Sequence, residues 1–323
     1  MCRPTSGRLR HGPPGGASIV AVANAVEVEG LRKSYGTLEA VRGISFTVAE
    51  GEVFAMLGPN GAGKTTTVEI LEGFRRRDGG RAEVLGFDPA SGDRRLKEQI
   101  GIVLQTSGVD PYLTVAETVD MFRGYYPKPR DRDEVIRLVG LEDKVGERVT
   151  KLSGGQKRRL DVAIALAGDP RLLFLDEPTT GFDPGARRNA WDVIKGLAEL
   201  GKTIFLTSHS MDEVQFLADR VTIIAGGKVV AEGTPESLVS RGAASTAIRF
   251  HKPSTPIPDS IRHLARIDDD TVEFETDDPT RMLHDLTSWA VNVGISLDGL
   301  QVMRPSLEDV YLDITREAEA VKS

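Results

Sequence analysis

A glycine-rich segment, Gly58-Pro-Asn-Gly-Ala-Gly-Lys-Thr65, restricts the folds open to this chain more than any other feature. It follows an apolar run over residues 52–57 that predicts a strand, and a helical pattern comes after it. In such a strand–turn–helix unit, backbone amides and the positive helix end bind phosphate oxygens. The spacing predicts a phosphate-binding loop in an α/β domain, with Lys64 on the β and γ phosphates and the Thr65 hydroxyl on Mg²⁺.

Apolar runs that do not alternate with polar residues recur along the chain, as expected of buried parallel strands. Gly226-Gly227 separates two further apolar runs and predicts a hairpin, which closes this first domain near residue 240. The predicted parallel strands cover residues 52–57, 100–105, 172–176 and 203–208.

Three helical patterns follow one another between residues 114 and 168, where no strand is evident. We interpret residues 107–168 as a helical subdomain inserted between two strands. The helices are expected over residues 115–125, 131–139 and 156–167.

A second, smaller unit follows the first domain. Residues 241–258 are rich in Ser, Pro and Ala, which suits a linker. Residues 259–318 predict a hairpin, a helix, a further strand and a final helix over 306–314. This indicates a small accessory α+β domain, and no catalytic pattern is evident in it.

Composition and charge exclude several classes of function. The formal net charge of −7 argues against a nucleic-acid partner, and the single cysteine, Cys2, allows neither a disulfide framework nor a thiolate metal site. No apolar run is long enough for a membrane-spanning helix, so a membrane role requires a partner. Residues 1–25 resemble a secretion signal only loosely, since the apolar run is short and follows Pro13-Pro14-Gly15-Gly16, and we interpret them as a disordered tail.

Asp176 and Glu177 stand at the carboxyl end of the predicted strand 172–176. An aspartate there can hold Mg²⁺ through water, and a glutamate beside it can act as general base toward an attacking water. Taken alone, such a pair is more often a solvated turn. The phosphate loop upstream favours the catalytic interpretation.

The segment Leu152-Ser-Gly-Gly-Gln156 separates classes of phosphate-loop proteins. Kinases, GTPases and helicases share the loop and the magnesium carboxylate. This segment adds a serine hydroxyl and free backbone amides at the start of a second helix, which suits an anion. As an isolated pentapeptide it is equally compatible with a simple helix cap.

Five elements in order resemble an ATP-binding cassette domain over about residues 26–240. The resemblance implies a P-loop NTPase fold of the ABC ATPase type, with an antiparallel β subdomain and a helical subdomain, that binds ATP and Mg²⁺. It also implies a head-to-tail dimer of two copies, in which the Leu152–Gln156 segment of one caps ATP on the other, and a polytopic membrane permease as partner. The elements are Gly58 to Thr65, Gln105, Leu152 to Gln156, Leu172 to Glu177, and His209.

The same resemblance assigns roles to single residues. Gln105 is expected to contact Mg²⁺ and the attacking water, His209 the γ-phosphate, and Tyr35 the adenine ring by stacking. Asp183 matches the loop that bridges the two subunits, and Phe182 before it replaces the leucine common in the family. The implied catalytic residues are Glu177, His209, Gln105 and Lys64, and the implied metal ligands are Thr65, Gln105 and Asp176. The implied nucleotide contacts are Tyr35, Gly58, Pro59, Asn60, Gly61, Ala62, Gly63, Lys64, Thr65, Thr66, Ser153, Gly154, Gly155, Gln156 and Asp183.

The carboxyl-terminal stretch 305–315 is similar to the ending of ATPase subunits of drug and antibiotic exporters, including daunorubicin-resistance-type pumps. An amphipathic helix packed on its own domain explains the segment equally well. The favoured function is an ATPase that drives export of a drug, antibiotic or other small hydrophobic compound, from the cytoplasmic face of the membrane and through a separate permease. The alternatives are a soluble cassette ATPase in DNA maintenance or translation, and a P-loop kinase.

Overall fold

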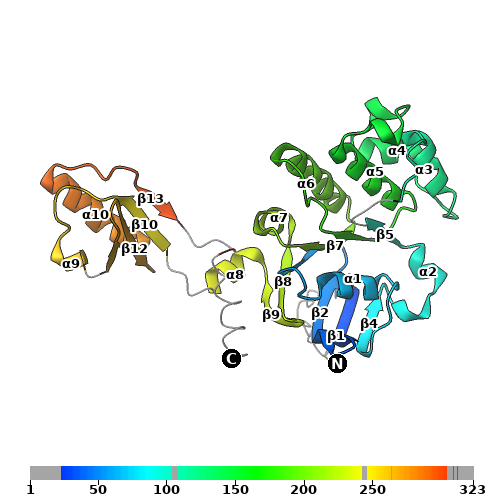
Figure 1. Ribbon diagram of the computed structural model, residues 1–323, viewed down its shortest axis with the longest axis horizontal. Helices are drawn as coiled ribbons and strands as arrows, with labels where there is room; N and C mark the ends of the chain where they lie inside the picture. Colours follow the sequence, from blue (N-terminus) through cyan, green and yellow to red (C-terminus); the bar gives the residue numbers. More distant parts are fainter. Residues whose placement is uncertain are drawn as a thin grey trace, which may run out of the picture.

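The computed structural model describes residues 23–103, 108–241, 246–262, 264–303, 308 and 311 (Figure 1). Of the predicted tail 1–25, residues 1–22 lie outside this set, and the last two residues are not a tail, because β1 begins at Asn24. Gln105 and most of the predicted final helix also lie outside it; the two described residues of that helix, Glu308 and Tyr311, are helical.

A six-stranded sheet forms the centre of the first domain, in the order β5-β6-β7-β3-β8-β9. All neighbours are parallel except β9, which pairs antiparallel with β8 as the predicted hairpin. The strands are β3 (Val53–Leu57), β5 (Ile100–Val103), β6 (Leu172–Asp176), β7 (Thr203–Ser208), β8 (Arg220–Ala225) and β9 (Lys228–Gly233).

Both faces of this sheet are buried, because successive side chains of a strand point to opposite sides. In β3, Val53, Ala55 and Leu57 join one apolar cluster, while Phe54 and Met56 join another. Burial on both faces explains why these strands have no polar alternation in sequence.

A second sheet, antiparallel and three-stranded in the order β2-β1-β4, packs against one of those clusters. Phe46 of this sheet stacks on Phe54 with ring centroids 5.4 Å apart. It is the predicted antiparallel β subdomain, made of β1 (Asn24–Tyr35), β2 (Leu38–Ala49) and β4 (Gly79–Val84).

The predicted helical subdomain lies between β5 and β6 and forms one end of the first domain in Figure 1. Its helices are α3 (Val115–Arg123), α4 (Arg132–Leu138) and α5 (Gly154–Leu166). Helix α5 begins two residues before the predicted start at Gln156, because the Ser153 side chain caps it and the glycines are already helical.

Further helices and turns complete the first domain. The helices are α1 (Lys64–Leu71), α2 (Arg94–Lys97), α6 (Pro184–Glu199), α7 (Met211–Leu217) and α8 (Pro235–Arg241), and the 3₁₀ turns are η1 (Pro89–Ser91), η2 (Glu142–Lys144) and η3 (Val149–Lys151). Among the described residues, no helix combines the length and the apolar character that crossing a bilayer requires.

The predicted linker 241–258 is wrong over residues 246–251, which form β10 in the middle of the second domain's sheet. Ile248 and Phe250 are buried in the core of that domain, whereas Arg249 and His251, the residues that follow each of them, are exposed. The Ser, Pro and Ala on either side of this short strand hid its alternation. The domain consists of β10 (Thr246–His251), α9 (Asp259–Arg262), β11 (Ala265–Ile267), β12 (Thr271–Thr276), α10 (Pro279–Val293) and β13 (Gln301–Met303).

The chain returns from the second domain to the first. Half-buried Tyr311 packs against the apolar cluster that contains Leu238 and the inner residues of β3.

Candidate nucleotide site

The phosphate loop runs from the end of β3 into α1, and two of its glycines are required by close packing. A Cβ atom at Gly58 would lie 2.4 Å from the Ile224 carbonyl oxygen, and one at Gly63 would lie 2.5 Å from that of Ala40. Gly63 also has a φ of 104°, a conformation that side chains disfavour. The loop is therefore held against its neighbours, with the start of α1 directed to the carboxyl edge of the sheet.

Lys64 is buried at the centre of this loop. Its Nζ donates to the Gly58 carbonyl at 2.7 Å and to that of Pro59 at 3.3 Å, and lies 3.4 Å from Oε1 of Glu177. The ammonium group is thus fixed between the loop and the candidate base. Phosphate oxygens entering the loop would meet this positive charge.

Two oxygen ligands suited to Mg²⁺ stand together beside the loop. The Thr65 hydroxyl donates to Oδ2 of Asp176 at 3.4 Å, and the Thr207 hydroxyl donates to Oδ1 of the same carboxylate. Mg²⁺ takes hard oxygen ligands and usually binds through one or two protein groups plus substrate phosphates and water. The residues present therefore fit the ion.

Glu177 is surrounded by partners that favour its charged form. His209 Nδ1 lies 3.4 Å from Oε2, and the Thr180 hydroxyl donates to the same oxygen at 3.2 Å. Burial alone would raise the pKa of this carboxyl, but Lys64 and His209 outweigh it and hold the pKa below the ordinary value of 4.5. Glu177 is ionised at neutral pH, as a general base must be.

The serine–glycine turn, residues 153–156, lies apart from this cluster. Ser153 Oγ accepts from the Gln156 amide at 3.3 Å, and Gln156 Oε1 accepts from the Ser153 amide at 2.9 Å, a reciprocal capping box. The turn and the Gly181–Asp183 segment line a hollow of about 330 Å³, and none of its lining residues belongs to the phosphate loop. Asp183 Oδ1 there caps α6 by accepting from the Ala186 amide at 2.9 Å.

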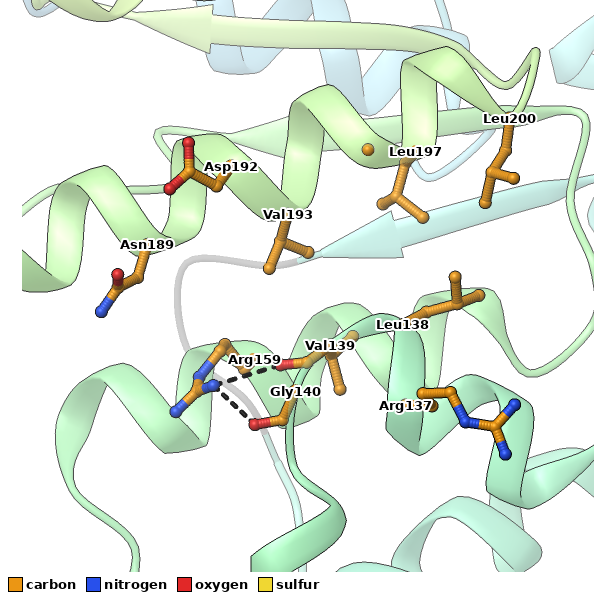
Figure 2. Close-up of a pocket in the computed structure, with 11 residues that line it drawn as sticks. Arg137, Leu138, Val139, Gly140, Arg159, Asn189, Asp192, Val193, Leu197 and Leu200 are labelled. Atoms are coloured by element: carbon orange, nitrogen blue, oxygen red, sulfur yellow. Dashed lines mark hydrogen bonds between the residues drawn. The ribbon is translucent and has the colours of Figure 1, made fainter.

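A second hollow, of about 570 Å³, lies next to the first, between the end of α4 and helix α6 (Figure 2). Val193 and Leu197 of α6 face Leu138 and Val139 across it. Asp192 is the one carboxylate among its described lining residues, so it offers no acid pair for catalysis. This second hollow lies where α6 meets the helical subdomain.

Tyr35 ends β1 and is partly exposed at 39%. The Arg75 guanidinium lies 5.2 Å from its ring centroid, and Lys33 Nζ lies 5.8 Å away. A base stacking on this ring must use the face opposite Arg75 or displace it.

The structure brings five predicted site residues together at the carboxyl ends of β3, β6 and β7, and leaves the turn 153–156 and Asp183 at a separate surface. Sequence reasoning missed Thr207, which pairs in register with Asp176 across β6 and β7. Thr207 could have been identified from its position two residues before His209, at the carboxyl edge of the sheet where ligands bind. The five are Lys64, Thr65, Asp176, Glu177 and His209.

The two domains match two separate families. Residues 41–180 match the family described as "ABC transporter", and residues 246–306 match "ABC transporter domain-containing protein-like, C-terminal domain".

Curated relatives cover nearly the whole chain. Nod factor export ATP-binding protein I of Rhizobium meliloti (strain 1021) is 38% identical over 90% of this chain and 88% of its own. Linearmycin resistance ATP-binding protein LnrL of Bacillus subtilis (strain 168) is 36% identical over 90% of this chain and 98% of its own. Daunorubicin resistance ATP-binding protein DrrA2 of Streptomyces coeruleorubidus is 35% identical over 90% and 95%.

Solved structures match the first domain. CbiO1 from Clostridium perfringens, described as part of the ABC transporter complex cbiONQ, is 30% identical with a TM-score of 0.61, over 68% of this chain and 91% of its own. The dimeric post-hydrolysis state of the ATP-binding cassette MJ0796 bound to ADP and Pi is 25% identical with a TM-score of 0.58, over 65% and 98%.

Proposed function

Because this chain belongs to the ABC transporter family, as an ATP-hydrolysing subunit of the exporter type, we propose that two copies bind MgATP head to tail and that Glu177 activates the attacking water.

The observation that carries the proposal is the separation of the site into two halves. The phosphate loop, Asp176, Glu177 and His209 form one half, and the turn at Ser153 lines a hollow that contains no loop residue. A second copy turned head to tail supplies each turn to the other's loop. The dimeric state of the related MJ0796 cassette supports this arrangement.

Each group acts at a definite atom of the reaction. Glu177 takes a proton from water as the water oxygen bonds to the γ-phosphorus, and the bond to the ADP oxygen breaks. Lys64 and His209 stabilise the negative charge on the γ-phosphate oxygens; the support is that both lie 3.4 Å from the Glu177 carboxylate. Mg²⁺, held by Thr65 and Asp176, would neutralise charge on the β and γ phosphates.

The Ser153 hydroxyl is suited to complete the partner's site. Its oxygen accepts the cap hydrogen bond from Gln156, which leaves its own hydrogen available for donation. Together with the free amides at the start of α5, it presents donors to an anion.

The driven process is export through a separate polytopic membrane subunit, with this chain on the cytoplasmic face. The supporting observation is that curated relatives are named for Nod factor export and for linearmycin and daunorubicin resistance. A drug, antibiotic or other small hydrophobic compound is the cargo class most consistent with those names.

Glu177→Gln tests the catalytic assignment. Loss of the base is expected to lower ATP turnover by roughly 10²- to 10⁴-fold while ATP still binds. With ATP and Mg²⁺, the variant should elute as a dimer in size-exclusion chromatography, because hydrolysis no longer separates the ATP-bound dimer. Glu83→Gln, a half-buried carboxylate paired with Arg81 on the antiparallel sheet, is the matched control and should turn over normally. Near-normal turnover of Glu177→Gln would show that another group is the base.

A further inference from the structure

Glu177 has an unusual backbone conformation. Its φ is +46°, in the left-handed region that residues with a side chain rarely adopt. Such a conformation is strained and persists only where the surroundings hold it. The direction of the Glu177 side chain therefore depends on the groups that fix the backbone around it.

Arg158 of α5 holds the backbone on both sides of Glu177. Its Nη2 donates to the Asp176 carbonyl at 3.2 Å, and its Nε donates to the Pro178 carbonyl at 3.1 Å. These carbonyls belong to the residues immediately before and after Glu177. Arg158 is only 8% exposed, so both bonds lie in a region largely shielded from water.

Other bonds fix the same loop from the sheet and from α7. The Glu177 amide donates to the Thr207 hydroxyl at 3.1 Å, and the Thr179 hydroxyl donates to Glu213 Oε1 at 2.6 Å. These bonds hold the loop at single points, whereas the planar guanidinium spans the strained residue. An ammonium group on a flexible stem does not have this fork.

We propose that Arg158 is a positioning residue for the general base: its guanidinium clamps the carbonyls of Asp176 and Pro178 and so aims the Glu177 carboxylate at the attacking water. The inference rests on the proposed function, since it assumes that Glu177 is the base. Arg158 lies two residues after Gln156 in the same helix. Helix α5 thus connects the general base of one nucleotide site, through Arg158, to the turn 153–156 that contacts the nucleotide of the other site.

Arg158→Gln tests the clamp in the full-length protein. A small displacement of a catalytic group costs up to about 10²-fold in rate, so kcat is expected to fall about 10- to 100-fold. KM for ATP should stay within about threefold, because the phosphate loop is untouched. Lys157→Gln removes the same charge from an exposed neighbour on α5 and should leave kcat unchanged. Wild-type kcat in Arg158→Gln would overturn the proposal.

A double variant separates positioning from general destabilisation. If Arg158 acts only through Glu177, adding Arg158→Gln to Glu177→Gln should not lower the residual rate further. An equal loss in both backgrounds would show that Arg158 merely supports the fold and would overturn the proposal. If Arg158→Gln does not fold, Arg158→Lys replaces it in both backgrounds, and the same two outcomes decide.

The two levels of the hypothesis fail in different ways. Normal turnover of Glu177→Gln contradicts the proposed function itself. An inactive Glu177→Gln together with a fully active Arg158→Gln contradicts the clamp alone.

Discussion

The pKa values of two glutamates near Asp176 are shifted in opposite directions. The pKa of Glu177 is held below 4.5 by Lys64 and His209 against the effect of burial. Burial, with the charges of Asp176 and Glu69, raises the pKa of Glu72 to about 8. Glu72 directly follows α1 as its C-cap residue and is only 6% exposed. At neutral pH the first is a charged base and the second is mostly a neutral acid.

Glu72→Gln should stabilise the protein at high pH. Between pH 4.5 and about 8 the folded chain keeps the Glu72 proton and the unfolded chain does not, so raising the pH favours unfolding. An isosteric neutral amide removes this dependence. The gain at pH 8 is expected to be on the order of 2 kcal/mol, given about 1.4 kcal/mol per pKa unit and incomplete burial. At pH 4.5 no gain is expected.

Urea unfolding in magnesium-free buffer at the two pH values measures this effect. Glu83→Gln, at a half-buried position of β4 where the carboxylate pairs with Arg81, serves as the control and should show no pH-dependent gain. A gain of equal size at both pH values would contradict a role for the Glu72 proton.

At the scale of elements, side-chain caps fix where the helices that carry the site begin. Ser153 caps α5, Asp183 caps α6 and Ser210 caps α7, each by accepting an amide hydrogen bond from within the first turn. Two of these caps, Ser153 and Asp183, line the same hollow. The residues expected to meet a second copy are thus also the residues that begin their helices.

Ser153→Ala separates these two roles of the serine. Loss of the cap is expected to cost about 1 kcal/mol of stability. Loss of the hydroxyl toward the partner's nucleotide should in addition lower ATP turnover by 10-fold or more at saturating ATP. The measurement pairs thermal unfolding with steady-state ATPase.

Thr114→Ala is the matched control for Ser153→Ala. Thr114 caps α3 with the same reciprocal box, through Glu117, and lines neither hollow. It should lose similar stability and keep its turnover. Full ATPase activity of Ser153→Ala would contradict a composite site.

The sequence predicted most of the first domain because each local signal agreed with the tertiary fold. Buried strands such as 172–176 have no polar interruption, and capped helices have recognisable first turns. The clamp by Arg158 was not predictable, since it joins residues about twenty positions apart through backbone carbonyls, which leave no pattern. The strand β10 was missed because Ser- and Pro-rich flanks outweighed its short alternation.

At the scale of the molecule, the chain combines a cassette with a separate small domain that has its own core. Ile248, Phe250, Val272 and Phe274 form the centre of that core, under α10. The matched families divide at the same place, between residues 180 and 246.

Affinity purification of the tagged chain from detergent-solubilised native membranes should recover a polytopic membrane protein in stoichiometric amount. The reason is that the similar proteins include ATP-binding proteins of exporters, and transport across a bilayer requires a membrane-spanning subunit. An unrelated protein with the same tag is the control. Recovery of ribosomes or DNA instead of a membrane protein would support the soluble alternative.

The return of Tyr311 to the cassette means that the small domain is fastened at both of its ends. A domain that is joined by one flexible linker samples a wide volume. When the chain is attached at both ends of the domain, the volume that the domain can sample is far smaller. Residues 246–303 are thus restricted to the neighbourhood of α8. Any surface on which they bind another molecule therefore lies on one side of the cassette.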